Sequence, residues 1–326
     1  MAGEEIATSS CPFSVVREAD LERELALLCE AIADAPAGAF GPGSMVWRID
    51  KEAAIFLGAG RALLLQLAHP WIAAAIAQHS RTLTDPIGRF HRTFNSVFAM
   101  VFGTTGQALA AARRLHQRHA GINGILTEPA GCFAAGSRYE ANDVAALCWV
   151  HATLVDSALI AYELVFPPLS AEERERYWTE ARRFAAFFGI PQDALPQSWA
   201  DFAAGNDRLL GSDLLSVGDE ARKIARVVMS GVGTSLPIPS WYRALTARLL
   251  PARLRAELGL PYGKIEHRKS ERALAVLRRV YPWVPALLRH VGPYQEASAR
   301  LAGGVRPGVA TRLSNRLWIG QKSMAR

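Results

Sequence analysis

Apolar residues recur along this chain at the three- and four-residue spacing of helices, and nowhere do apolar and polar residues alternate in a sustained way. A half-buried strand needs that alternation, because successive side chains of a strand point to opposite faces. We therefore expect an all-α fold without a sheet of any size. With 326 residues, half of them hydrophobic, the chain is long enough to bury a sizeable core.

Proline and glycine breaks mark where the expected helices end. The predicted helices cover residues 19–34, 53–78, 86–102, 106–122, 142–165 and a stretch that begins after Ser170. Ser170 and Glu173 have the spacing of a capping box, which typically opens a helix. The apolar stretch 53–78 contains Arg61, His69 and Pro70, so two packed core helices joined near His69-Pro70 fit it better than a membrane span.

The expected organisation is a mobile lead-in over residues 1–17, one helical domain over residues 18–305, and a tail over residues 306–326 without an assignable structure. The chain starts Met1-Ala2-Gly3-Glu4-Glu5, which has neither the basic region nor the apolar core of a secretory signal. The four cysteines lie far apart, so neither a disulfide scaffold nor a zinc knuckle is indicated. These features predict a cytoplasmic protein without a signal peptide or a transmembrane segment.

The run Gly88-Arg89-Phe90-His91-Arg92-Thr93 places polar groups in an otherwise apolar predicted helix. Arg89 and Thr93 are four residues apart and share one helix face, and Arg92 lies beside that face. A buried guanidinium needs a partner, because an unpaired one is costly. A carboxylate-bearing ligand is one candidate partner, and Asp85, four residues before Arg89, is the alternative.

Several histidines are candidate site residues, and spacing alone leaves the role of each one open. His116 and His119 are three residues apart on the next predicted helix and are neighbours on its surface, so only one of them needs to face a site. His151 follows Trp149 on an apolar helix and is compatible with a hydrogen-bonded core histidine or with a pocket residue. His69 precedes a helix-breaking proline and is either structural or part of a cavity lining.

This chain resembles one known protein family in four places, which are the segment from Arg89 to Thr93, the helix end at Phe102-Gly103, the pattern His119-x-x-Ile122-x-Gly124 and the run Trp149-Val150-His151-Ala152-Thr153. The family is that of the rubber oxygenases (latex-clearing proteins) and the oxygenases of the mycophenolic-acid pathway. The resemblance extends from about Phe40 into the C-terminal helices. Members of this family are all-α and bind haem b through one axial histidine, and the rubber-cleaving members use dioxygen to split isoprenoid double bonds.

The resemblance implies a role for each candidate. His119 matches the axial iron ligand, Arg89 and Thr93 match polar residues of the haem pocket, and Arg92 matches the distal basic residue. Rubber-cleaving members carry a lysine at that distal position, and a lysine can lose its proton and ligate iron, whereas an arginine almost never can. We therefore expect Arg92 to pair with a haem propionate or to orient bound oxygen. Because the rubber-cleaving members are exported, polymeric rubber is not the expected substrate.

Charge is distributed unevenly in this chain, whose formal net charge is +7. From Pro251 onward there are fifteen Lys and Arg against four Asp and Glu, a balance of +11. The basic run over residues 264–272, followed by Tyr281-Pro282-Trp283, fits either a weak association with an anionic membrane surface or a solvated helix face. We expect no nucleic-acid partner, because the chain has no recognised binding motif and no stacking pattern of aromatic residues.

The motifs of several other enzyme classes are missing from the sequence, including those of di-iron bundles, zinc hydrolases, serine hydrolases and dinucleotide-binding folds. Together with the resemblance, this predicts a single large helical domain with a haem cavity between its central helices. The predicted protein is a haem-b-dependent oxygenase that uses dioxygen to oxidise or cleave a double bond in a hydrophobic, isoprenoid-like small molecule. In it His119 holds the iron, His69 and His151 are further candidates for contact with the cofactor, and Arg89, Arg92 and Thr93 are the catalytic residues. Two alternatives stay open: a non-catalytic haem-binding sensor or carrier, and a helical interaction protein without a cofactor.

Overall fold

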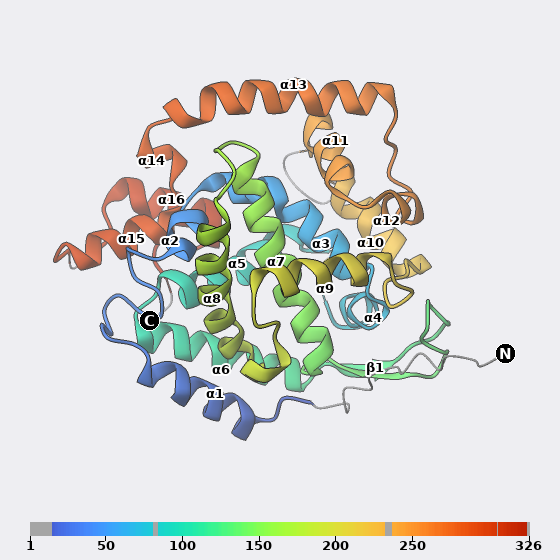
Figure 1. The fold of residues 1–326 in the computed structure, drawn as a ribbon, viewed down its shortest axis with the longest axis horizontal. Helices are drawn as coiled ribbons and strands as arrows, with labels where there is room; N and C mark the ends of the chain where they lie inside the picture. Colours follow the sequence, from blue (N-terminus) through green and yellow to red (C-terminus); the bar gives the residue numbers. More distant parts are fainter. Residues whose placement is uncertain (1–14, 81–83, 232–236, 305, 325–326) are drawn as a thin grey trace.

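The computed structural model describes residues 15–80, 84–231, 237–304 and 306–324. The described residues form a helical bundle with one two-stranded sheet at its edge (Figure 1). The expectation of an all-α fold is confirmed, and the small antiparallel sheet pairs Gly124 with Tyr139.

The first half of the chain contains the helices and strands α1 (Glu18–Glu30), α2 (Met45–Asp50), the 3-10 helix η1 (Ala53–Gly58), α3 (Ala59–Leu67), α4 (Pro70–His79), α5 (Pro86–Phe102), α6 (Thr105–Ala120), β1 (Asn123–Ile125), β2 (Arg138–Glu140) and α7 (Val144–Glu163). The second half contains α8 (Ala171–Ala185), η3 (Ala186–Phe188), η4 (Gln192–Ala194), α9 (Trp199–Gly211), α10 (Asp219–Ser230), α11 (Ser240–Leu249), α12 (Ala252–Glu257), α13 (Lys264–Val280), η5 (Tyr281–Trp283), α14 (Ala286–Arg289), α15 (Gly292–Leu301) and α16 (Val309–Ile319).

Helix α7 is the central element of the bundle and contacts η1, α2, α3 and α8 (Figure 1). It is long and apolar enough to cross a membrane, but 56% of that segment is buried inside the protein, as in the core helix of a helical bundle. Gly58 allows η1 to approach α7 closely, because a Cβ there would lie 2.4 Å from the carbonyl oxygen of Ser157.

The segment made of η1, α3 and α4 also passes the length and hydropathy test for a membrane span, but it is bent by 99°. The bend falls where the sequence predicts it, with His69 at the N-cap of α4 and Pro70 as its first residue. Proline is favoured at that position because its missing N–H would have no helical partner there.

Side-chain caps set several helix starts at the predicted places. Helix α5 spans Pro86–Phe102 as expected, and the carboxylate of Asp85 accepts a hydrogen bond from the N–H of Gly88 at 2.8 Å. Helix α8 starts after Ser170, whose side chain and that of Glu173 form the predicted capping box. Local sequence therefore decides where these helices begin.

Both ends of the described chain pack on the bundle. In the lead-in expected over residues 1–17, residues 1–14 lie outside the described part, and Val16 is buried, with its N–H donating to the carbonyl oxygen of Asn142 at 2.8 Å. The tail over residues 306–326, which had no expected structure, contains α16. This helix packs against α5 and α15, and its Trp318 stacks on Phe56 of η1 with ring centroids 4.2 Å apart.

Candidate functional site

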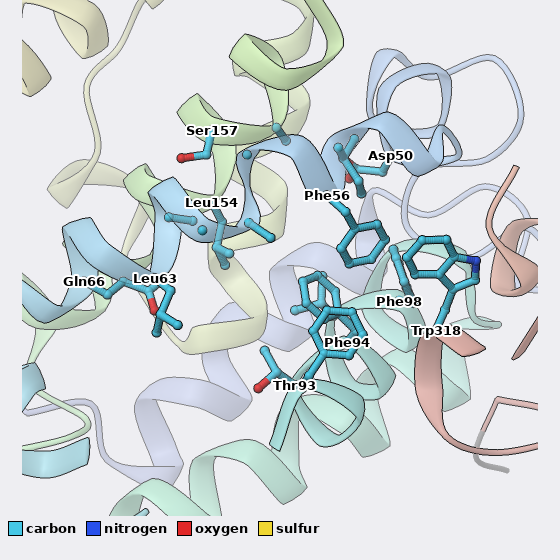
Figure 2. A pocket seen from close by; sticks show the side chains of 18 of the residues that line it. Asp50, Phe56, Leu63, Gln66, Thr93, Phe94, Phe98, Leu154, Ser157 and Trp318 are labelled. Atoms are coloured by element: carbon cyan, nitrogen blue, oxygen red, sulfur yellow. The ribbon is translucent and has the colours of Figure 1, made fainter. Parts of the chain in front are cut away.

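Two adjoining pockets lie beside α5 and share part of its surface. The first, about 560 Å³ in volume, is lined mainly by apolar and aromatic side chains of η1, α3, α5 and α7, and we call it the apolar pocket (Figure 2). The second, about 550 Å³, is lined by residues of α4, α5, α6 and α7 that include His119, and we call it the histidine pocket. Five residues line both pockets and form the junction between them: Gln66, Arg89, Thr93, Val97 and Leu154. Each volume is in the range usual for small-molecule sites.

Helix α5 brings the predicted polar residues to the junction. Because Arg89 and Thr93 are one helical turn apart, both line the two pockets, and Arg92 lines the histidine pocket beside them. Burial is the main cause that lowers the pKa of Arg89 to about 10, and the positive charge of Arg92 contributes further. An anion near Arg89 would relieve both effects.

The sequence analysis offered Asp85 as a partner of Arg89. In the structure Asp85 forms an ion pair with Arg92. The guanidinium of Arg92 forms an ion pair with the carboxylate of Asp85 at 3.0 Å, and about half of the Arg92 side chain is exposed. The same carboxylate caps α5. This pair holds Arg92 at the rim of the histidine pocket.

Helix α6 places His119 in the wall of the histidine pocket. The helix begins with a capping box between Thr104 and Gln107, and His119 lies in its last turn. Burial, with smaller contributions from the charges of Arg118 and His116, lowers the pKa of His119 to about 4. The imidazole is therefore neutral at neutral pH and keeps a nitrogen lone pair that can ligate a metal.

The two neighbouring histidines of α6 have different surroundings. His119 lines the histidine pocket, whereas His116 is buried and lines neither of the two pockets. The structure thus directs one of the pair to the site, as their spacing allows.

His151 and His69, both predicted to contact a cofactor, line neither pocket. His151 is buried on α7, where its Nε2 is 2.8 Å from the carbonyl oxygen of Ala181 and its ring lies beside those of Trp178 and Phe184. This is the arrangement of a hydrogen-bonded core histidine. His69 is buried at the start of α4 beside the rings of Trp71 and Phe133.

Three residues that the sequence reasoning missed line the pockets. Asp50, the last residue of α2, and Trp318 of α16 line the apolar pocket, and His79 at the end of α4 lines the histidine pocket. The Nε2 of His79 is 3.0 Å from the carbonyl oxygen of Asn123, which occupies one ring nitrogen. No local pattern marks these residues, because distant segments bring them to the pockets.

The histidine pocket fits a cofactor that supplies most of its own ligands. Within the described ranges, no group of three or more His, Cys, Asp or Glu side chains gathers as a metal-binding cluster. An iron porphyrin requires only one neutral histidine, and His119 can supply it, because the porphyrin provides four nitrogen ligands. The cations of Arg89, Arg92 and Arg118 line the same pocket and suit the two propionates.

Comparison with known proteins agrees with this geometry. The family model described as the catalytic domain of the ER-bound oxygenase mpaB/B′ and rubber oxygenase matches residues 46–286, nearly three quarters of the chain. The match covers every lining residue of both pockets except Trp318. No curated protein and no solved structure matches the chain. The chain therefore belongs to the mpaB and rubber oxygenase family, a family of oxygenases.

Proposed function

We propose that this protein is a haem-b-dependent oxygenase that oxidises or cleaves a double bond in a hydrophobic, isoprenoid-like molecule. The observation that carries the proposal is the meeting of His119, Arg89, Arg92 and Thr93 around one pocket of about 550 Å³. These residues come from two different helices. Membership of an oxygenase family supports the reaction class, and the pocket composition supports the cofactor.

The neutral imidazole of His119 would hold the haem from the end of α6, and Arg89, Arg92 and Arg118 would meet its propionates. Bound haem supplies the activation of dioxygen that side chains alone cannot provide. Half-buried Arg89 offers the strongest anion contact of the three, because its charge is largely desolvated and beside another cation. Half-exposed Arg92 would orient a propionate at the rim.

The apolar pocket would bind the substrate next to the histidine pocket. Its walls exclude water and discriminate weakly among apolar chains, at about 1–3 kcal/mol per methylene. At the junction, a double bond in the apolar pocket would reach the histidine pocket. The hydroxyl of Thr93 belongs to a side chain of α5 that lines both spaces, as does the guanidinium of Arg89.

Two measurements test this proposal against its alternatives. After haem supplementation, the absorption spectrum should show a Soret band at one haem per chain; a helical interaction protein without a cofactor would show none. Oxygen consumption with polyprenyl substrates should then follow, whereas a haem sensor or carrier would bind haem and consume no oxygen.

A second proposal concerns the surroundings of the enzyme: α13 and the residues after it associate weakly with anionic membrane surfaces. One outward face of α13 carries both apolar and basic side chains that are exposed, as their spacing of three, four and seven residues requires. The apolar side chains are Ile265, Val276 and Val280, and the basic ones are Arg268, Lys269, Arg272 and Arg279. Just beyond the helix, Trp283 is 86% exposed and Leu288 is 72% exposed. Mixed basic and apolar groups on an exposed helix suit the headgroup region of a membrane. In Figure 1, α13 lies along one edge of the molecule, where its outward face is accessible.

A further inference from the structure

The apolar pocket contains a carboxylate that has no partner in the protein. Asp50, at the end of α2, points into this pocket beside Phe56 (Figure 2). Over the described part of the chain, its carboxylate makes no hydrogen bond and no ion pair. Asp50 lies deep in the protein yet keeps some accessible surface, and that surface faces the pocket.

This position is unfavourable for a charged group. Burial raises the pKa of Asp50 to about 7, and the C-terminal end of a helix disfavours negative charge. Tyr177 of α8 does not offset the negative charge of Asp50. Its own pKa is raised by burial and by the negative charges of Asp50, Asp156 and Glu180. An unpartnered carboxyl that faces a cavity is typical of a group that meets a ligand.

Asp156 and Glu180, the other two carboxylates that act on Tyr177, are already engaged with other partners. The guanidinium of Arg61 forms an ion pair with Asp156 at 2.7 Å, and the carboxylate of Glu180 accepts a hydrogen bond from the N–H of Val46 at 2.9 Å. Asp50 therefore remains available to a molecule in the pocket.

The other polar side chains of the apolar pocket also have protein partners. Tyr242 donates its O–H to the carbonyl oxygen of Phe56 at 2.8 Å, Ser157 accepts from Arg61 at 2.8 Å, and Gln66 donates to Thr153 at 3.0 Å. Tyr177 donates its O–H to the carbonyl oxygen of Val155 at 3.3 Å. Away from the junction, Asp50 is thus the hydrogen-bond acceptor without a protein partner among the described side chains of this pocket.

Aromatic side chains surround the rest of this space. The ring of Phe56 stacks on Trp318 at 4.2 Å and meets Phe94 edge-on at 4.7 Å, and Phe94 continues the row to Phe98 along α5 (Figure 2). A flat or extended apolar group fits such a row, because aromatic faces contribute large apolar contact areas. The pocket thus combines one hydrogen-bonding end with an apolar wall.

We propose that the apolar pocket takes a hydrophobic molecule that carries a hydroxyl group, and that Asp50 determines this specificity by accepting the hydrogen bond of that hydroxyl. The inference deepens the proposed function and rests on it for one point, namely that the remainder of the molecule extends to the junction with the histidine pocket. A hydroxyl suits this site better than an ammonium group. It can pair with either protonation state of the carboxyl, whereas a desolvated ammonium requires the ionised state.

Calorimetric titration with two matched probes tests the proposal. Farnesol and farnesyl methyl ether differ by one O–H donor and are titrated into the purified protein, with and without added haem. We expect the wild type to bind farnesol at least about tenfold more tightly than the ether, as one charge-assisted hydrogen bond requires. Asp50→Leu should bind both probes equally and remain as resistant to unfolding as the wild type, because it removes an unpartnered buried group.

Glu180→Gln is the matched control, because this neighbouring carboxyl does not line either pocket. It should retain the full preference for farnesol. Equal affinity of the wild type for both probes, an undiminished preference in Asp50→Leu, or tighter binding of farnesylamine than of farnesol would overturn the inference.

The oxygenase proposal is tested separately by oxygen consumption. A preference for farnesol that depends on Asp50, without oxygen consumption, would support the hydroxyl site and overturn the oxygenase assignment. Oxygen consumption with farnesol that is unaffected by Asp50→Leu would support the oxygenase and overturn the role of Asp50.

Discussion

The buried side chain of Asn142, just before α7, acts on His119 in the last turn of α6 and offsets a small part of the lowering of its pKa by burial. Its amide nitrogen also donates to the carbonyl oxygen of His116, one turn earlier in α6, at 3.3 Å. The amide oxygen is a second hydrogen-bonding group, and it can accept from the ring of His119. We expect such a contact to orient the ring and to leave the other ring nitrogen for the histidine pocket.

Replacement of His119 is expected to abolish stoichiometric haem binding. In His119→Ala the pocket loses the imidazole that we propose as the iron ligand, and His79, the other histidine of its wall, is held at the carbonyl oxygen of Asn123. His116→Ala is the matched control, since His116 is on the same helix and lines neither pocket. Haem titration followed by the Soret band measures both variants. A normal histidine-ligated spectrum in His119→Ala would contradict the assignment.

Replacement of Asn142 should weaken haem binding without removing the ligand. Groups that orient a metal-bound histidine typically contribute roughly 10- to 100-fold in metal affinity. We expect a loss in that range for Asn142→Ala, measured as haem transfer to apomyoglobin. Added imidazole should not restore it, since His119 is still present. Unchanged haem affinity, with an altered free energy of unfolding, would show that Asn142 serves only the packing of α6 against the start of α7.

The two arginines of α5 are expected to differ in effect. Arg89→Met should lower haem affinity at least about tenfold, because it removes a desolvated cation whose charge-assisted hydrogen bond is worth about 1.5–3 kcal/mol. Arg92→Met should have a smaller effect, because its guanidinium is half exposed and paired with Asp85. Equilibrium haem titration at constant ionic strength compares them. Equal losses in both variants would contradict the distinction between a buried and a rim contact.

The pH dependence of stability reports on Asp50 independently of any ligand. Its pKa is about 7 in the folded protein and about 3.9 in an unfolded chain. Between these values the folded state binds the proton and the unfolded state does not, so the free energy of unfolding falls as the pH rises from about 4 to 7. Asp50→Asn should remove this contribution and be more stable than the wild type above pH 7, by as much as about 4 kcal/mol.

Urea unfolding at pH 4.5 and pH 8 measures this difference. Burial lowers the pKa values of His69, His119 and His151 to about 4, so these histidines lower stability as the pH falls below about 6.5. Both proteins contain them, and their effect cancels in the comparison. If the free energy of unfolding changes equally with pH in the wild type and in Asp50→Asn, water solvates the Asp50 carboxylate fully.

Charge reversal on α13 tests the membrane proposal. Each basic side chain near an anionic surface contributes about 1 kcal/mol, so the double variant Arg268→Glu, Lys269→Glu should lose more than tenfold in cosedimentation with phosphatidylserine vesicles. Binding by the wild type should weaken as added salt shortens the Debye length. Arg138→Glu, on the exposed strand β2, is the control for net charge. No binding at low salt, or binding unaffected by salt, would contradict the proposal.

Much of the fold could be predicted from local sequence. The start and end of α5, the capping box of α8 and the break at His69-Pro70 depend on neighbours within a few residues, so the sequence alone shows them. The same applies to the shared face of Arg89 and Thr93, which helical geometry dictates. The role of His119 as a cofactor ligand was predicted from family resemblance, and its position in the pocket wall is compatible with that role.

Tertiary structure decided the rest. His119 and His151 both follow apolar helical patterns, but only packing shows that His119 faces a pocket while His151 bonds to the carbonyl of Ala181. Asp50 and Trp318 are 268 positions apart in the sequence, yet both line the apolar pocket. Helical periodicity specifies which residues share a face of one helix. Which faces meet, and what cavity they leave, depends on contacts between segments far apart in the chain, and a local pattern does not encode those contacts.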